Sequence, residues 1–183
     1  MDIALLVLDI QKDYISDQAQ MSVAKHQIDP MLERVNTIID KFKNRGIPVV
    51  YVGNEFEPKK FIGNFLRKNS ALKGSEGAEL GERLLRVNDI YFSKNKGNAL
   101  SNLELVSYLN SNKVKHIVIV GLFAEACVTA TALDSIRKNS SVTVVKDAVA
   151  SSNDSKREKS LNYLNSRGIA IIDSSQLFKV FLN

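Results

Sequence analysis

The sequence has one cysteine and two histidines among its 183 residues, and it has no long apolar run. One cysteine cannot form a disulfide within the chain, so the composition does not indicate an oxidising compartment. The apolar runs fall well short of the roughly 18 residues that a membrane-spanning helix needs. The cysteine and the histidines also lack the spacing of a zinc site. We therefore expect neither a disulfide-stabilised scaffold, nor a membrane-spanning protein, nor a zinc module.

Neither the start of the chain nor its charge pattern indicates a secreted protein or a nucleic-acid-binding protein. The stretch MDIALLVLDIQKDY has a short apolar run bracketed by Asp2 and Asp9, whereas a signal peptide has basic residues first and a longer apolar stretch. We expect a cytoplasmic protein that does not act at a membrane. The net charge of +5 comes from lysines and arginines scattered among 20 acidic residues. The densest basic cluster, residues 156–159, itself contains Glu158, and no stripe of interleaved aromatic and basic residues indicates nucleic-acid binding.

Short apolar runs alternate with helical patterns along the whole chain. The expected strands are residues 3–9, 47–53, 89–94, 115–121, 141–147 and 168–173. The expected helices are residues 30–44, 78–86, 101–110, 127–137, 154–166 and 176–181. This strict alternation predicts an α/β fold with a doubly wound, mostly parallel six-stranded sheet and helices on both faces. Because no linker or internal repeat interrupts the pattern, we expect residues 1–183 to form a single domain.

Three chemically reactive side chains stand at the carboxyl ends of expected strands. Asp9 ends the first strand, Lys94 ends the third, and Cys127 lies in the turn and first helical residues after the fourth. In a doubly wound sheet, ligands bind in the crevice beyond the carboxyl ends of the strands. The topology therefore predicts that these three side chains meet at one edge of the sheet.

The three residue types together are typical of acyl transfer through a thioester. A thiolate at a helix N-terminus is stabilised by the helix dipole and by free backbone N–H groups, and a nearby ammonium lowers the thiol pKa further. A carboxylate within reach can accept the thiol proton and pass it to a leaving group. Backbone N–H groups in the turn can hold an oxyanion. We therefore expect Cys127 to be the nucleophile.

Taken singly, each of the three residues also has an ordinary structural interpretation. Asp9 can cap a turn, Lys94 can be a solvated lysine at a strand end, and Cys127 can be a small packing residue. Their joint placement favours chemistry. Histidine is the usual base for a cysteine nucleophile, but His116 opens its strand at the opposite edge of the sheet and His26 lies in a polar loop. The base is therefore expected to be the aspartate.

Three motifs in order resemble one family over essentially the whole chain. LDIQKDY resembles the D-x-Q-x-D-F opening of the isochorismatase-like cysteine hydrolases, which include nicotinamidases and N-carbamoylsarcosine amidases. SKNKGNALSNLEL resembles the family's lysine segment, and its spacing selects Lys94 rather than Lys96. GLFAEACVTATALDS is similar to G-x-x-x-x-x-C-V-x-x-T-A-x-D-A, and VVKDAVASS continues the match.

The resemblance implies a catalytic triad of Asp9, Lys94 and Cys127. It also implies a cis peptide bond between Leu122 and Phe123, with the backbone N–H groups of Phe123 and Cys127 forming an oxyanion hole. A cis bond between two residues other than proline costs about 3–4 kcal/mol and persists only where the surroundings enforce it. The ring of Phe123 is expected to lie near the substrate.

The segment after the second strand departs from the nicotinamidase pattern. Nicotinamidases carry histidine ligands to a metal there, whereas VGNEFEPKKF has no histidine. We therefore expect no metal and no cofactor. Asn54 and Glu55 from this segment, together with Tyr14, are expected by position to face the crevice and bind substrate. The alternative, that they only cap and pack, is left open.

The sequence thus predicts a metal-independent cysteine amidohydrolase that cleaves a small amide or carbamoyl compound through a thioester. One alternative is a vinyl ether hydrolase of the isochorismatase type, in which Cys127 is a bystander. Another is a nucleotide- or flavin-binding α/β module, although G-x-G-x-x-G does not follow the first strand. The expected partner is a small-molecule amide substrate, and the resemblance implies a homo-oligomer, a dimer or larger.

Overall fold

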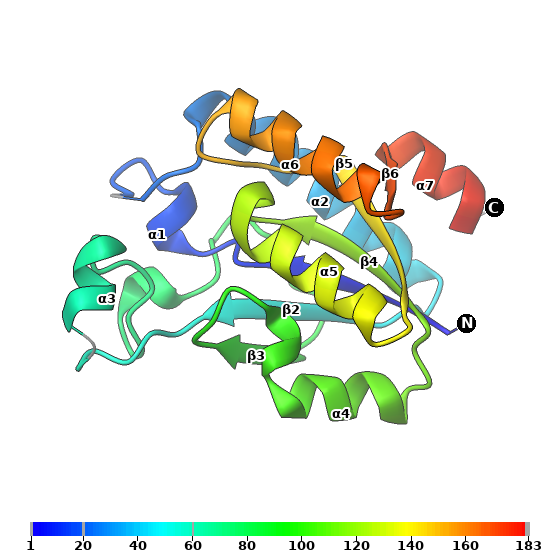
Figure 1. Ribbon diagram of the computed structural model, residues 1–183, viewed down its shortest axis with the longest axis horizontal. Coiled ribbons are helices and arrows are strands. Elements are labelled where there is room, and N and C mark those ends of the chain that lie inside the picture. The colour runs from blue at the N-terminus through cyan, green and yellow to red at the C-terminus, as the bar shows by residue number, and fades with distance from the viewer. Residues whose placement is uncertain (1, 20, 60, 182–183) are drawn as a thin grey trace.

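The centre of the molecule is one sheet of six strands, seen in a computed structural model that describes residues 2–19, 21–59 and 61–181 (Figure 1). The strands are β1 Ile3–Leu8, β2 Val49–Asn54, β3 Tyr91–Lys94, β4 His116–Gly121, β5 Ser141–Val149 and β6 Ala170–Ile172. They lie in the order β3-β2-β1-β4-β5-β6, and every neighbouring pair is parallel. This arrangement confirms the predicted doubly wound α/β fold.

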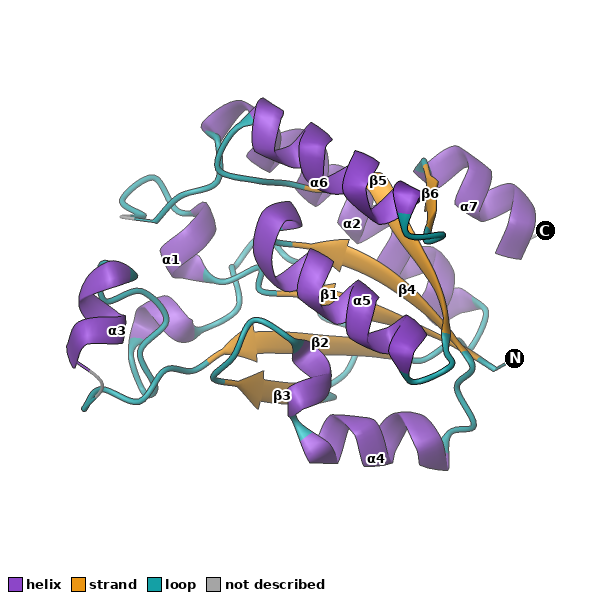
Figure 2. Ribbon diagram, viewed as in Figure 1, coloured by secondary structure: helices purple, strands orange, loops and turns teal. Residues whose placement is uncertain are grey.

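Helices cover both faces of this sheet (Figure 2). They are α1 Lys12–Ile15, α2 Lys25–Asn44, α3 Phe61–Leu66, α4 Leu103–Ser111, α5 Thr129–Arg137, α6 Asp154–Ser166 and α7 Ser174–Phe181. Tighter or wider turns form at Glu76–Ala78, Ala99–Ser101 and Ala124–Val128, the last of them π-helical. α2 and α7 pack on one face, and α4, α5 and α6 pack on the other. None of the described helices combines the length and the apolar character that crossing a membrane requires.

The central strand β1 explains why the first apolar run has no polar interruptions. Its alternate side chains enter two separate cores, Ile3, Leu5 and Val7 on the α2 side and Ala4, Leu6 and Leu8 on the other side. Every residue of β1 is buried, as expected for a strand covered on both faces. Each large aliphatic side chain buried in this way stabilises the fold by roughly 1.5–3 kcal/mol.

Two expected helices differ from the structure. α2 begins at Lys25 rather than at Pro30, because a proline near the start of a helix removes only one hydrogen bond, here to the carbonyl of His26. The helix expected over residues 78–86 is wrong: that segment contains only the end of the turn Glu76–Ala78 and irregular backbone. There Gly81 packs so closely on Ile15 that a Cβ would lie 2.4 Å from its Cδ1.

The strand arrows in Figure 1 point toward the side of the molecule that carries α1 and α3. The carboxyl ends of the parallel strands therefore face the loops that connect β1 to α1 and β2 to α3. Any site built from strand-end residues lies at this edge.

Candidate active site

Asp9, Lys94 and Cys127 meet at the carboxyl edge of the sheet. Lys94 Nζ lies 2.9 Å from Asp9 Oδ2 and 3.4 Å from Cys127 Sγ. The side chains of Asp9 and Lys94 have no exposed surface, and Cys127 is only 6% exposed. The ammonium thus joins a carboxylate and a sulfur atom in a site shielded from water, as the topology predicted for their positions.

The backbone brings the ends of β1 and β4 together. Asp9 has a left-handed backbone with φ of 54°, and its N–H donates to Val52 O at 2.8 Å. Gly121 has φ of 111°, and a Cβ at that residue would lie 2.1 Å from Leu8 O. Leu122 N–H donates to the same oxygen at 2.9 Å. These contacts turn Asp9 out of its strand toward the start of the segment that carries Cys127.

The thiol is neutral in the resting site. Burial, and then the negative charge of Asp9, raise the pKa of Cys127 to about 12, although Lys94 acts in the opposite direction. Burial by itself would lower the pKa of Lys94, but the negative charge of Asp9 and the contacts of the ammonium with Asp9 and Cys127 outweigh it and raise that pKa. The expected low thiol pKa is therefore wrong in direction, because desolvation and the carboxylate together exceed the effect of the ammonium.

One carboxylate oxygen of Asp9 is left without a protein partner. Oδ2 accepts from Lys94, whereas Oδ1 is buried and has no hydrogen-bond partner among the residues that the structure describes. A buried polar atom without a partner is unusual and calls for an explanation. Here it leaves an oxygen inside the site that can accept a hydrogen bond.

The turn before Cys127 differs from the expectation in one respect. The bond between Leu122 and Phe123 is trans, as are all peptide bonds of the described residues, so the expected cis bond is wrong. In the trans form, Leu122 N–H reaches Leu8 O and Ala124 N–H reaches Ala150 O at 2.9 Å each. Both flanks of the turn are thus held without the cost of a cis bond. Phe123 N–H has no acceptor among the described residues.

Of the residues expected to bind substrate, Asn54 and Tyr14 lie beside the three central residues, and Phe123 packs on Tyr14. Asn54 Oδ1 accepts from Lys94 Nζ at 2.6 Å, and its Nδ2 lies 3.4 Å from Tyr14 OH. The rings of Tyr14 and Phe123 meet edge to face with centroids 5.2 Å apart. The Glu55 side chain instead accepts from Tyr91 OH at 3.0 Å, and its backbone N–H donates to Lys94 O at 2.7 Å.

Gln11 is a member of this site that reasoning from the sequence missed. Its Nε2 donates to Asn54 O at 2.8 Å and to Ala78 O at 2.6 Å, while its Oε1 accepts from Asn54 N at 2.8 Å. It is fully buried. Its position two residues after Asp9, inside LDIQKDY, was the available signal, because a glutamine beside a strand-end carboxylate seldom packs without polar partners.

Both histidines lie away from the sulfur, as expected. His116 opens β4 at the other end of the sheet, where its ring bonds Thr143 Oγ1 at 2.9 Å and burial lowers its pKa. His26 is exposed on α2 and contacts Asp154 at 2.8 Å. Within residues 2–19, 21–59 and 61–181, no three His, Cys, Asp or Glu side chains are grouped so that they could hold a metal ion.

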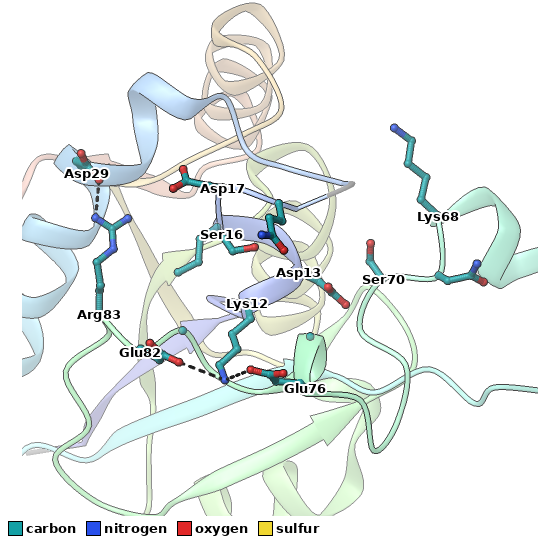
Figure 3. Close-up of a pocket in the computed structure, with 15 residues that line it drawn as sticks. Lys12, Asp13, Ser16, Asp17, Asp29, Lys68, Ser70, Glu76, Glu82 and Arg83 are labelled. Atoms are coloured by element: carbon teal, nitrogen blue, oxygen red, sulfur yellow. Dashed lines mark hydrogen bonds and ion pairs between the residues drawn. The ribbon is translucent and has the colours of Figure 1, made fainter.

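A cavity of about 950 Å³ lies beside α1, and none of the three central residues lines it (Figure 3). Its lining includes Lys12, which contacts Glu76 at 3.0 Å and Glu82 at 3.4 Å, and Arg83, which contacts Asp29 at 2.7 Å. Both cations are thus paired with carboxylates, and the lining holds more acidic than basic side chains. The cavity is thus a polar surface feature separate from the buried triad.

Comparisons with known proteins bear on the family and the fold of the chain. The family model described as the isochorismatase domain matches residues 3–176. A probable inactive nicotinamidase of Arabidopsis thaliana is 29% identical over 158 residues, which cover 80% of each protein. An isochorismatase-like hydrolase from Alkaliphilus metalliredigens superposes with a TM-score of 0.89 at 21% identity, over 98% of each chain. The N-carbamoylsarcosine amidase of Thermoplasma acidophilum gives a TM-score of 0.82 at 25% identity, over 95% of this chain and 97% of that one.

Proposed function

Because the chain belongs to the isochorismatase family of hydrolases, we propose that it is a metal-independent cysteine amidohydrolase. Its substrate is a small amide or carbamoyl compound, cleaved through a thioester on Cys127. The observation that carries this proposal is the buried series of contacts from Asp9 through Lys94 to the Cys127 sulfur. The likeness to an N-carbamoylsarcosine amidase supports hydrolysis of a C–N bond as the reaction.

Asp9 acts as the base in the first step. Because the thiol is neutral at rest, attack requires that its proton leave as the sulfur bonds to the carbonyl carbon. The unpartnered Oδ1 of Asp9 is the acceptor for that proton. Lys94 stays protonated, keeps Asp9 oriented through Oδ2 and stabilises the negative charge that develops on sulfur.

The negative charge on the substrate oxygen is held by backbone N–H groups of the turn. Those of Leu122 and Ala124 are engaged with Leu8 O and Ala150 O, whereas that of Phe123 is not engaged with any described residue. Phe123 N–H, together with Cys127 N–H, is the proposed oxyanion hole. Donors placed in advance in a dry site stabilise such a charge more strongly than water does.

The second half of the reaction reverses the proton transfer. When the tetrahedral intermediate collapses, the C–N bond breaks and the protonated Asp9 gives its proton to the departing nitrogen. A water molecule then loses a proton to Asp9 and attacks the thioester carbonyl. The acid leaves, and the proton returns from Asp9 to the Cys127 sulfur, which restores the resting site.

The position of the nucleophile favours a small substrate. Cys127 and Tyr14 are both nearly inaccessible, at 6% and 2% exposed, and the rings of Tyr14 and Phe123 pack against each other beside the site.

The segment after β2, with sequence VGNEFEPKKF, offers no histidine ligand, which supports a reaction that does not depend on a metal.

The test is a screen of small amides, ureas and carbamoyl amino acids for release of ammonia. We expect turnover of at least one class, and we expect Cys127→Ala to lower its rate at least about a thousandfold. Mass spectrometry of Asp9→Asn mixed with that substrate should show slowed formation of an acyl adduct on Cys127. Asp17→Asn is the control. It removes one carboxylate charge, as Asp9→Asn does, but at an exposed residue, and it should keep wild-type activity.

Full activity of Cys127→Ala on an amide would refute the thioester mechanism. Hydrolysis of a vinyl ether such as isochorismate by Cys127→Ala, without turnover of any amide by the wild type, would assign the site to acid-type chemistry instead.

A further inference from the structure

Asn54 lies against the Cys127 sulfur and two of the polar groups near it. Its Oδ1 accepts the shortest hydrogen bond of Lys94, at 2.6 Å. Its Nδ2 lies 3.4 Å from Tyr14 OH and 3.9 Å from Cys127 Sγ. Asn54 is itself buried, at 4% exposed. The amide therefore contacts the ammonium on one side and the sulfur on the other, which is unlike a side chain directed at a substrate.

The backbone of Asn54 is held in place by a second buried amide. Gln11 donates to Asn54 O and accepts from Asn54 N, at 2.8 Å in both cases. This pairing needs a glycine next to Asn54, since a Cβ on Gly53 would lie 3.1 Å from Gln11 Nε2 and 2.5 Å from Tyr91 OH. The end of β2 is thus fixed relative to the start of α1, 43 residues earlier in the chain.

We propose that Asn54 is a positioning residue that holds the Lys94 ammonium between Asp9 and Cys127, and that Gln11 in turn holds Asn54. This inference rests on the proposed function and reassigns Asn54 from the substrate to the catalytic machinery. An ammonium has three N–H donors. In Lys94 these reach Asp9 Oδ2, Cys127 Sγ and Asn54 Oδ1. Without the amide, the third donor is buried and unpaired, and the ammonium is free to move from the sulfur.

The polar groups around the sulfur include two charged side chains, those of Asp9 and Lys94. Asp9 follows β1, Lys94 ends β3, and Tyr14 lies on α1 with its hydroxyl beside Asn54. Asn54 is neutral, and so is the Tyr14 hydroxyl, whose pKa is raised by burial. Converting Asn54 to aspartate keeps the shape of the side chain and adds a negative charge next to both Lys94 and the sulfur. A charge at this range shifts a thiol pKa upward by about 1–3 units.

The test is the rate at which iodoacetamide alkylates Cys127 between pH 6 and pH 11, measured by mass spectrometry of the intact protein. We expect Asn54→Asp to shift the pH profile to higher pH, so that alkylation at pH 9 is at least about tenfold slower than in the wild type. Asn54→Leu, which keeps the volume but removes both hydrogen bonds, should be slower by about three- to tenfold. Circular dichroism confirms that each variant is folded.

Asn153→Asp is the matched control. Asn153 caps α6 by accepting from Lys156 N, a role that aspartate also fills, so its profile should coincide with that of the wild type. Profiles of folded Asn54→Asp and Asn54→Leu that both lie within twofold of the wild type would overturn the proposal. Because alkylation needs no substrate, this outcome is distinct from a failure to find amidase activity.

The role of Gln11 is tested by a double-mutant cycle. Gln11→Leu should slow alkylation in the same direction as Asn54→Leu, although Gln11 makes no hydrogen bond to Asp9, Lys94 or Cys127 side chains. If Gln11 acts through Asn54, alkylation of the double variant should be at most about twofold slower than alkylation of Asn54→Leu alone. Effects that multiply would show that Gln11 acts on the site by another route and would contradict this part of the proposal.

Discussion

At the scale of single residues, the site depends on an ion pair that water does not reach. Both side chains of the Asp9–Lys94 pair have zero exposed surface. Removing one partner of such a pair leaves the other charge buried and uncompensated, which costs more than the pair contributes by its presence. The pair that the proposed mechanism uses is therefore also a weak point of the fold.

This property predicts an asymmetry between two lysine substitutions. Lys94→Met should lower the free energy of unfolding by about 3–5 kcal/mol, because Asp9 is left without its cation. Lys138→Met removes an ion pair with Asp134 whose lysine is 46% exposed, and it should cost less than about 1 kcal/mol. Urea unfolding monitored by circular dichroism measures both. Equal and small effects would mean that the Asp9–Lys94 pair is solvated in solution.

At the scale of elements, the site depends on how closely the ends of β1 and β4 approach. Gly121 is the point of contact, with positive φ and with no space for a Cβ against Leu8 O. The backbone that follows it leads directly into the turn Ala124–Val128 that carries Cys127. A side chain at this glycine would separate the two strand ends and displace Asp9 from Lys94.

We therefore expect Gly121→Ala to be severe. It should lower the free energy of unfolding by more than about 3 kcal/mol, since it combines backbone strain with a clash against the main chain. Gly168→Ala is the control, because Gly168 also has positive φ, 81°, but a methyl group there would meet no atom within 4 Å. That variant should cost only about 1 kcal/mol. Thermal unfolding compares the two, and similar losses would show that the close approach is not what selects glycine at residue 121.

Local sequence signals predicted some elements well and others poorly. The helix Asp154–Ser166 has the bounds that were expected. In the structure Asn153 caps it with an oxygen that accepts from Lys156 N, and asparagine is a common residue at this position. The segment between β2 and β3 was not readable, because its form depends on tertiary contacts. Ala71 N–H, for example, donates to Asp13 Oδ2 at 2.8 Å, from 58 residues away.

At the scale of the whole molecule, the candidate site also has features that the sequence predicted and features that it did not. The meeting of Asp9, Lys94 and Cys127 was predictable because parallel strands place their carboxyl ends at one edge. The roles proposed for Asn54 and Gln11 depend on pairings between backbone and side chain across 43 residues. The motif LDIQKDY indicates that Gln11 needs polar partners, but it does not say which residue supplies them. The direction of the thiol pKa was also missed, since burial is a property of the assembled fold.

That burial links the stability of the whole molecule to pH. The pKa of the Cys127 thiol is about 12 in the folded chain, against an ordinary value of 9.0. A pKa that folding raises contributes stability that is fully present below the unfolded value and is lost as pH rises toward the folded value. The wild type should therefore lose stability between pH 9 and pH 11 for a reason that a chain without the thiol does not share.

Cys127→Ser removes this titration while keeping the rest of the fold, so the two proteins should respond differently to alkaline pH. From pH 8 to pH 11, the free energy of unfolding of the wild type should fall by about 2–3 kcal/mol more than that of the variant. Titration of the lysines and tyrosines that do not interact with Cys127 is common to both and cancels in the comparison. Urea unfolding at pH 8, 9.5 and 11 measures the difference. Parallel losses in the two proteins would mean that the thiol ionises as readily when folded as when unfolded, and the neutral resting thiol inferred for the site would be wrong.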